Sequence, residues 1–347
     1  MKKATASAIA VIFALFSLIS CQKGIFAPAT DSAVAEEMLR LIPKDVAAVF
    51  FINFNGAMQI EKVDEFFNEK VQDEKFEGYS DYQKLIEMTG IDPKKDIQFI
   101  AVAMKEGTER YTENYDEWAV GIVNLKYNKD SLMSFIRFKN EEEGSQIIEE
   151  EYNGLTLYTV KEIVKGKEEE HSFTFIDKSN IVAGDVNLVK SVINVMQKKE
   201  ESVLKNEKFS TLFRDIDKGA LFWGGVLIPA ETTAKLAQEV PIASSMEAVQ
   251  AVSLLFDYDD RNIMAEIKLV SDDPIKNQEI ADNLISLKSM GSMITIQEFN
   301  FAEVLDRIEI YSAPDHVKIF ASFPEDFFNN FMDKFTLKDK GEEKKQS

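Results

Sequence analysis

The sequence is poor in the side chains that build most catalytic and metal sites, with one cysteine and two histidines among 347 residues. A disulfide framework needs paired cysteines, and a Cys/His zinc site needs several such ligands, so the composition excludes both. His171 and His316 lie in predicted turns or strand edges, where exposed side chains are expected. The Gly-x-Ser-x-Gly turn and the glycine-rich phosphate loops are absent. We therefore predict no catalytic residue, no cofactor and no metal site, and a protein that is not an enzyme.

Basic side chains are also scarce, because 40 Lys and Arg stand against 60 Asp and Glu and give a formal charge of −20. Such a surface repels a phosphate backbone, so nucleic acid is not expected as a partner. Long apolar runs are rare as well. The run from Ala8 to Ile19 has the length of a signal-peptide core and is too short for a comfortable transmembrane helix.

The N-terminus has the pattern of a targeting signal, with Lys2 and Lys3 before the apolar run. The sequence from Leu18 to Cys21, Leu-Ile-Ser-Cys, resembles the lipobox of bacterial lipoproteins. This resemblance implies that the Cys21 thiol receives a diacylglyceryl group, that the chain is cut before it, and that the new amino terminus is acylated. The alternatives are an ordinary secretory peptide with an incidental cysteine and an uncleaved anchor.

Lipidation at Cys21 predicts firm attachment to a membrane, because two or three acyl chains each contribute roughly 0.8 kcal/mol per buried methylene. Residues 1–20 are then the signal peptide, and residues 21–32 are the lipidated cysteine and its tether. Removal of Lys2 and Lys3 takes the formal charge from −20 to −22. The residue after the cysteine is Gln22 and not Asp. By resemblance to Gram-negative lipoproteins, this implies export to the outer membrane, with the protein facing the periplasm.

The body after the tether repeats an order of strand, strand and helix. Val46–Phe54 is predicted to be a central strand, and Asp185 and Asp273 are predicted to cap helices. This order predicts an α+β fold with antiparallel sheets and helices on one face. The strands that begin the four units are 97–104 and 118–125 in the first, 155–160, 172–176 and 180–183 in the second, 250–258 and 262–270 in the third, and 307–311 and 317–323 in the fourth.

A polar segment at residues 200–208 divides the body into two related halves, 33–200 and 201–337. Ser322 to Glu325 fits a capping box before a helix with Phe327, Phe328, Phe331, Met332 and Phe335. The tail from 338 to 347 is charged and predicted to be disordered.

Three stretches give the body a resemblance to a loosely defined family of uncharacterised extracytoplasmic bacterial proteins. These are Leu41–Asp45, Gly90–Ile97 and the unit from Ile181 to Phe209. The match is one of spacing and apolar pattern, so it implies a shared fold and assigns no activity to any residue.

Several acidic groups have two possible interpretations. Asp257, Asp259 and Asp260 offer oxygen ligands for Ca²⁺, but Arg261 interrupts them and favours a plain hairpin turn. Asp92 and Asp96 are the candidates for a carboxylate-dependent hydrolase, which is the least supported hypothesis. Consecutive glutamates occur at 141–143, 149–151 and 168–170. They fit solvated loops or strand edges protected by charge, and the alternative is a site for a cation or a basic partner.

The 26 phenylalanines form clusters that fit either a helix packed on its sheet or an apolar pocket. Gly224 and Gly225 lie inside an apolar run, which favours close packing or a bulge over a phosphate loop. We expect first a lipid-anchored envelope protein that presents an acidic body to another envelope protein. The alternative is a binder of an apolar or lipid-like ligand between the two halves.

Overall fold

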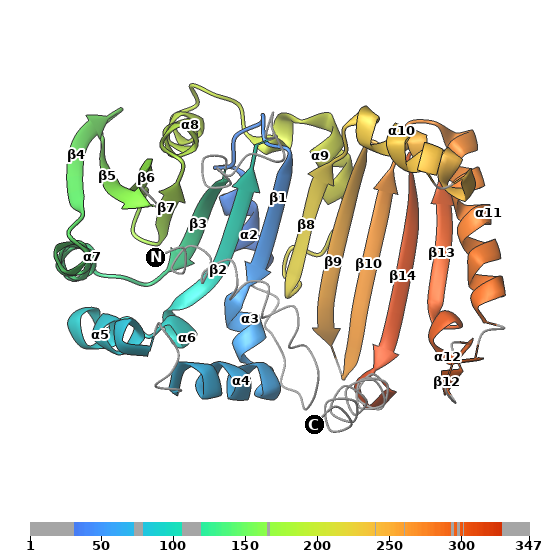
Figure 1. The fold of residues 1–347 in the computed structure, drawn as a ribbon, viewed down its shortest axis with the longest axis horizontal. Helices are drawn as coiled ribbons and strands as arrows, with labels where there is room; N and C mark the ends of the chain where they lie inside the picture. The colour runs from blue at the N-terminus through green and yellow to red at the C-terminus, as the bar shows by residue number, and fades with distance from the viewer. Residues whose placement is uncertain are drawn as a thin grey trace.

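The computed structural model describes residues 31–72, 79–105, 119–164, 167–239, 241–259, 261–292, 295–296, 299–300 and 302–327. The predicted signal peptide, Cys21 and the predicted tail lie outside these residues. The predicted α+β class is confirmed, since mixed helices surround an antiparallel sheet (Figure 1).

Twelve strands form one sheet in the order β13-β14-β10-β9-β8-β1-β2-β3-β7-β6-β5-β4, and every neighbouring pair is antiparallel. The predicted central strand is β1, which lies inside the sheet beside β8 and β2. The bounds are β1 Ala48–Asn53, β2 Ile97–Met104, β3 Ala119–Leu125, β4 Gln146–Tyr152, β5 Leu155–Val164, β6 Lys167–Phe175, β7 Asn180–Gly184, β8 Phe222–Leu227, β9 Ala251–Asp259, β10 Asn262–Val270, β13 Ile308–Ala313 and β14 His316–Pro324. A separate pair joins β11 Thr295–Ile296 to β12 Phe299–Asn300.

Side chains alternate between two faces of the large sheet. We call the face with Val49, Phe51 and Trp223 the rear face, and the face with Phe50 and Leu254 the front face, which is toward the viewer in Figure 1. Helices lie on both faces rather than on the predicted one. Those on the rear are α2 Asp31–Leu39, α8 Val186–Met196 and α9 Glu207–Phe213.

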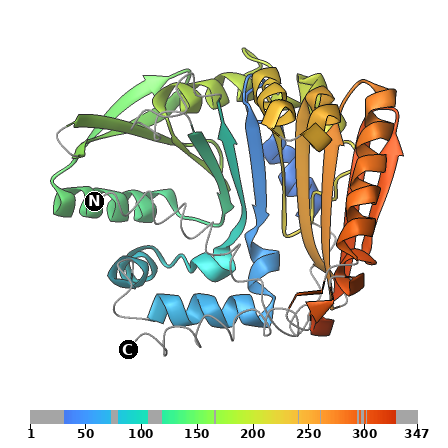
Figure 2. The same cartoon turned by 45° about the vertical axis from the view of Figure 1, so that its right-hand side comes forward.

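The front face carries the other main helices. In the first half these are α3 Phe54–Met58, α4 Glu61–Gln72, α5 Tyr79–Thr89, α6 Pro93–Asp96 and α7 Lys129–Glu143. In the second half they are α10 Ala230–Glu239, the 3₁₀ helix η2 Pro241–Ala248 and α11 Pro274–Gly291. Figure 2 shows α11 standing beside β13 at the edge of the sheet. Two short helices, η1 Val203–Lys205 and α12 Ala302–Leu305, complete the described elements.

The main core fills the space between the rear face and its helices. Trp223 is fully buried there, and its ring stacks on Phe51 at 4.2 Å between centroids. Phe213 of α9 meets the same indole edge-on at 5.2 Å. In α8, Val189, Val192 and Ile193 recur at helical spacing and are buried, which explains why this segment forms a helix against the sheet.

The two sequence halves meet where β1 pairs with β8. All strands from the first half lie on one side of this contact and all sheet strands from the second half lie on the other. Each half opens with a helix followed by a strand, and the same number of residues separates the equivalent buried positions. These are Ala35 and Phe209, Met38 and Leu212, Leu39 and Phe213, Ile42 and Ile216, Val46 and Ala220, and Val49 and Trp223. The sheet is continuous across the division near residue 200, and a division into separate domains stays a prediction.

Local predictions have mixed outcomes. Asp185 caps α8 by accepting from Leu188 N at 2.9 Å, and Asp273 caps α11 with Pro274 at its first position, as predicted. The capping box at Ser322 is wrong, because β14 continues through Pro324 and the Glu325 carboxylate accepts instead from Tyr258 Oη at 2.7 Å. Only the first turn of the predicted helix, through Phe327, is described.

Candidate functional site

The front face of the sheet carries three consecutive cross-strand rows from β1 to β13 that contain no charged side chain. All members except Ser312 are apolar or glycine. The first row is Ala48, Val226, Val252, Leu269, Val317 and Ser312, the second is Phe50, Gly224, Leu254, Ile267, Ile319 and Ile310, and the third is Ile52, Phe222, Phe256, Ala265, Ala321 and Ile308.

Helices pack on the first and third of these rows. On the first row, η2 and α11 pack on Val252, Leu269 and Val317. On the third row, α3 and α4 form a cluster with Phe256. Between them Leu254 is 39% exposed, which is unusual for an apolar side chain in the interior of a sheet.

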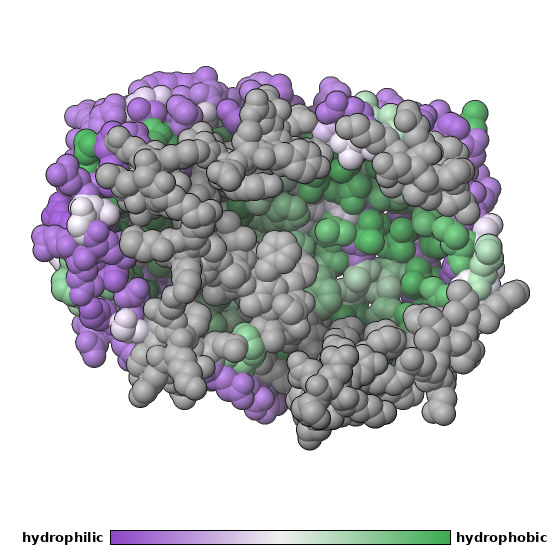
Figure 3. Space-filling view, viewed as in Figure 1, coloured by the Kyte–Doolittle hydropathy of each residue, from purple (hydrophilic) through white to green (hydrophobic). Residues whose placement is uncertain are grey.

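We define the open apolar face as Phe50, Leu254, Ala265, Ile267 and Ile319. Leu254 is exposed, and the other four side chains are half-buried. They come from β1, β9, β10 and β14, so this surface joins the two halves of the chain. Figure 3 shows apolar residues gathered over β9, β10 and β14 in a hollow of the front surface.

Gly224 shapes this surface at the contact between the halves. A Cβ atom at Gly224 would lie 2.6 Å from the carbonyl oxygen of Val49 and would also collide with the Phe50 side chain. The glycine therefore allows the Phe50 ring to lie across β8, where it stacks on Phe222 at 6.0 Å between centroids. The neighbouring Gly225 faces Leu212 of α9 at close range. The predicted role of these glycines in close packing is confirmed.

The rear face of the same strands has a different chemistry. Glu266 and Lys268 lie on that side of β10, and Lys318 of β14 forms an ion pair with Glu266. Lys268 is buried and its ammonium approaches the Leu212 carbonyl oxygen at 3.5 Å, while burial lowers its pKa. Charged groups are thus confined to the rear of these strands. The three front rows therefore offer a partner apolar contact, which is stabilised by the exclusion of water.

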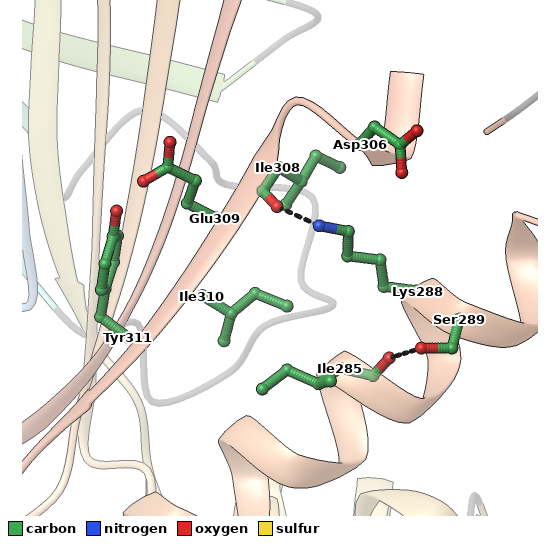
Figure 4. Close-up of a pocket in the computed structure, with 8 residues that line it drawn as sticks. All are labelled: Ile285, Lys288, Ser289, Asp306, Ile308, Glu309, Ile310 and Tyr311. Atoms are coloured by element: carbon green, nitrogen blue, oxygen red, sulfur yellow. Dashed lines mark hydrogen bonds between the residues drawn. The ribbon is translucent and has the colours of Figure 1, made fainter. Parts of the chain in front are cut away.

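A shallow pocket of about 410 Å³ lies between α11 and the edge strand β13 (Figure 4). Its lining is mostly polar. Lys288 Nζ donates to the Ile308 carbonyl oxygen at 2.6 Å, and Ser289 Oγ donates to the Ile285 carbonyl oxygen at 2.9 Å. The first bond attaches α11 to the edge strand β13 and the second lies within α11, so both have a structural explanation.

The candidate carboxylates Asp92 and Asp96 lie at the two ends of the one-turn helix α6, Asp92 as its N-cap and Asp96 as its last residue. Asp92 accepts from Lys94 N at 3.2 Å, and Asp96 accepts from Asp92 N at 2.8 Å. Burial acts to raise the pKa of Asp92, but the hydrogen bond and charge of Lys95 hold it below its ordinary value. The nearby Tyr82 has its pKa raised to about 12 by burial and by the Asp92 carboxylate. Both carboxylates are accounted for by helix capping.

Asp257 and Asp259 lie on β9, which forms the predicted hairpin with β10. Asp257 accepts from Leu221 N at 3.3 Å, and its burial raises its pKa. Arg261 has a positive φ of 68° in the turn, and Asp260 lies outside the described residues. Among the residues described, no group of three or more Asp, Glu, His or Cys side chains is arranged to hold a metal ion.

The two histidines are half-buried strand residues, so the prediction that they are exposed is wrong. His171 lies in β6. His316 is the first residue of β14, and its Nδ1 lies 2.7 Å from Asp315 Oδ1, which helps to lower the pKa of that carboxyl.

The acidic runs fall on three kinds of element. Glu141–Glu143 end helix α7, which corrects their assignment to a loop or strand edge. Glu149–Glu151 lie on β4, the edge strand of the sheet, as one of the predicted alternatives stated. Glu168–Glu170 lie on β6 beyond its contact with β7.

Sequence reasoning missed the openness of the front face. The alternation of Ile263, Ala265, Ile267 and Leu269 along the chain predicts burial of that side of β10, whereas the structure leaves its middle, Ala265 and Ile267, half-buried. The sequence did contain a signal for this openness. The strands β8, β9, β10 and β14 all have apolar residues on one side, and together they make more apolar surface than the helices next to them in the sequence can cover. Cys21, the predicted lipidation site, lies outside the described residues.

Comparison with models of protein families assigns the chain to a family. A family defined as proteins of unknown function, DUF3352, matches residues 4–302. The chain belongs to this family. No curated protein matches the sequence. For this DUF3352 protein, the family supplies no activity, so the function must be argued from its own residues.

Solved structures of TP0453 show a distant likeness. Crystal form III has a TM-score of 0.42 at 10% identity, over 84% of this chain and 96% of that one. Crystal form IV has a TM-score of 0.42 at 9% identity, over 85% and 95%. Within the part of this DUF3352 protein that the structure describes, no helix has the length and apolar character needed to cross a bilayer.

Proposed function

We propose that this protein is a non-enzymatic binding protein of the bacterial cell envelope, anchored by lipid at Cys21, that holds an apolar, acyl-chain ligand on its open apolar face. The observation that supports it most directly is Leu254, an exposed leucine in the second cross-strand row, which lies between the two rows on which helices pack. The surface draws on both halves, as the hypothesis of a ligand between the halves requires.

The chemistry of the surface favours an acyl chain over a peptide or a sugar. The three cross-strand rows offer neither charged groups nor, apart from Ser312, a polar side chain. Burial of about 200 Å² of apolar surface is worth roughly 5 kcal/mol before the entropy cost of binding. An acyl chain can supply such an area without leaving polar groups unsatisfied.

The proposed anchor would keep the open apolar face near a source of acyl chains. The first described residue, Asp31, accepts a hydrogen bond from Asn53 Nδ2 at 3.1 Å, which fixes the start of the body against the end of β1. Nine residues, 22–30, separate it from Cys21, and the chain between the two spans at most about 35 Å when extended. An envelope protein tethered in this way meets membrane lipids at high local concentration.

Native mass spectrometry tests the binding function. The processed protein, extracted with a mild detergent and freed of it, is expected to retain a species with the mass of an acyl lipid beyond the covalent modification at Cys21. Leu254→Asp is expected to lose that species, whereas Ile275→Asp, at a site 73% exposed on α11, is expected to keep it. A clean mass for the unsubstituted protein would contradict the proposal.

The anchor has a separate test. Labelled palmitate should be incorporated into the protein, and Cys21→Ala should abolish incorporation and shift the protein out of the membrane fraction. Unchanged maturation and fractionation of Cys21→Ala would contradict the anchor while leaving the binding surface intact.

A further inference from the structure

The strand β13 forms one of the two edges of the large sheet (Figure 1). It is joined to β14 by a two-residue turn between the paired residues Ala313 and His316. The backbone groups of successive strand residues point to opposite neighbours, and the pair that closes such a turn is hydrogen-bonded. The backbone groups of Ile308, Ile310 and Ser312 therefore point away from β14, out of the sheet.

The outer side of β13 is open. The Ile308 carbonyl oxygen accepts from Lys288 Nζ, as its outward direction requires. Within the part of the chain that the structure describes, the outward N–H and C=O groups of Ile310 and Ser312 have no hydrogen-bond partner. Ser312 is exposed. Both residues therefore offer unpaired backbone groups to another strand.

The two edges of the sheet differ in their protection. The opposite edge strand, β4, contains the run Glu149–Glu151, and such charge hinders pairing with another edge. In β13 the only charged residue is Glu309, and Tyr311 is 49% exposed. Figure 4 shows these two side chains on one side of the strand and Ile310 on the side of α11. β13 thus lacks the charge that guards β4.

The fold already contains an antiparallel contact between two equivalent strands. Val49 and Trp223 are equivalent positions in the two halves, so Phe50 is equivalent to Gly224. These last two residues are partners where β1 pairs with β8. The halves are thus related by an approximate two-fold axis that passes through this pair. Two copies of one strand can pair about a two-fold axis in the same way.

From these observations we propose that β13 is an interface between two copies of this chain. The strands pair antiparallel about a two-fold axis at Tyr311, and the sheet continues from one copy into the other. Each Ile310 then exchanges both of its outward backbone hydrogen bonds with Ser312 of the partner copy. The groups left unpaired at the edge are thereby satisfied.

Two features select this register. Ile308 lies opposite Pro314 of the partner copy, and a proline has no N–H to donate to the Ile308 carbonyl oxygen. Lys288 already donates to that oxygen, so the pairing displaces no existing bond. An axis at Glu309 instead of Tyr311 would place the carboxylates of the two copies directly opposite each other, which is destabilising.

The pocket beside the edge belongs to the same interface. A two-fold axis through the sheet keeps the front faces of both copies on one side, so their pockets meet. Ile285 of α11 is 45% exposed and lines the pocket together with Ile310. Burial of these side chains adds apolar contact to the backbone hydrogen bonds. The contact is small, so we expect it to be populated at protein concentrations of about 10–100 µM.

Disulfide trapping tests the register. The processed chain carries Cys21→Ser, so that the introduced thiol is the only one. Tyr311→Cys is expected to form linked dimers under mild oxidation at least about tenfold faster than Glu309→Cys. The two Cα atoms at the axis would lie about 4.5 Å apart, within reach of a disulfide. Glu309 is exposed on the same side of β13, but its two Cα atoms would lie about 14 Å apart.

Sedimentation analysis tests the backbone hydrogen bonds. The processed chain with Cys21→Ser is expected to form a concentration-dependent dimer in physiological salt, which screens the acidic charge. Ser312→Pro removes one outward N–H and leaves the bonds to β14 intact, so it should weaken the dimer at least about tenfold. Ser312→Val keeps this N–H and should associate like the parent. Thermal unfolding verifies that each variant folds.

Other results would overturn the interface. Equal linking by the two cysteine variants would mean that no register is fixed, and faster linking by Glu309→Cys would mean a different register. Dimers of Ser312→Pro as strong as those of the parent would place the contact elsewhere. A parent that stays monomeric throughout the concentration range would show that no second copy binds. The inference is independent of the proposed function, because none of these results depends on acyl-chain binding.

Discussion

The two halves of the chain share the rear side of the sheet and differ on the front side. Behind the sheet, α2 and β1 match α9 and β8 in order, and their equivalent buried residues fill one common core. In front, the helices of the first half pack on clusters that include Phe54, Met58 and Leu132, whereas the second half leaves Leu254 exposed between its helices. The difference indicates that the rear core maintains the fold, whereas the front of the second half contributes less buried apolar surface at Leu254.

The largest expected effect compares one leucine from each side of the second half. Leu212→Ala should lower the free energy of unfolding by about 2–5 kcal/mol, because Leu212 is fully buried under the rear face. Leu254→Ala should cost about 1 kcal/mol or less, since this side chain is already partly exposed. Urea denaturation measures both, and equal losses would remove the distinction between the two faces.

Glycine at the contact of the halves gives the next effect. Gly224→Ala should cost about 1–3 kcal/mol, because the added Cβ would collide with the Val49 backbone. Gly121→Ala is the control in the first half, where the nearest atom to the added carbon, Ala183 O, is 3.7 Å away and little change is expected. Thermal unfolding of both variants decides the comparison, and a neutral Gly224→Ala would refute the close contact.

Helix caps provide a smaller effect that should be alike in both halves. Asp185→Ala and Asp273→Ala each remove a side chain that accepts backbone N–H groups at the start of a helix. Each should cost about 1 kcal/mol, and Asn at either position should restore most of the loss. Chemical denaturation provides the measurement, and a variant as stable as the parent would contradict the capping role.

The smallest effects are pH-dependent and of opposite sign in the two halves. The lowered pKa of Asp92 means that its ionised form stabilises the fold above about pH 3.8, and this contribution is lost as the pH falls through the lowered value. The raised pKa of Asp257 means that ionisation costs stability as the pH rises from 3.8 through the raised value. Asp92→Asn should therefore lower the stability of the folded protein at pH 7. The difference from the parent should disappear in acid, where Asp92 is protonated.

Asp257→Asn should instead stabilise the protein at pH 7 relative to acidic pH, because it removes the cost of ionising a buried carboxyl. Melting temperatures measured from pH 3 to pH 7 test both variants together. Parallel pH profiles for the two substitutions would contradict the assigned shifts.

Many strands of the sheet could be predicted from the sequence. The exposure of the open apolar face could not. The bounds of β2 and β10 and the caps at Asp185 and Asp273 follow from alternation and capping patterns, which are local. For the glutamates of β4 the sequence left a solvated loop and a strand edge as alternatives, because an acidic edge strand lacks the apolar alternation that would decide between them. The order of the strands depends on long-range pairing such as β1 with β8, which no local pattern encodes.

The candidate site was less predictable for the same reason. The apolar pattern of β10 is read directly from the chain, but the exposure of its front side depends on where α11 and the helices of the first half pack. The candidate carboxylates Asp92 and Asp96 were identifiable by type, and only the structure shows that they cap a helix.

The most direct test of the account is titration of the processed chain with a fluorescent fatty acid. The account predicts saturable binding to the parent, at least about tenfold weaker binding to Leu254→Asp, and unchanged binding to Ile275→Asp, provided that all three melt cooperatively. Equal loss in both variants, or no saturable binding to the parent, would contradict the assignment of the open apolar face as the ligand site.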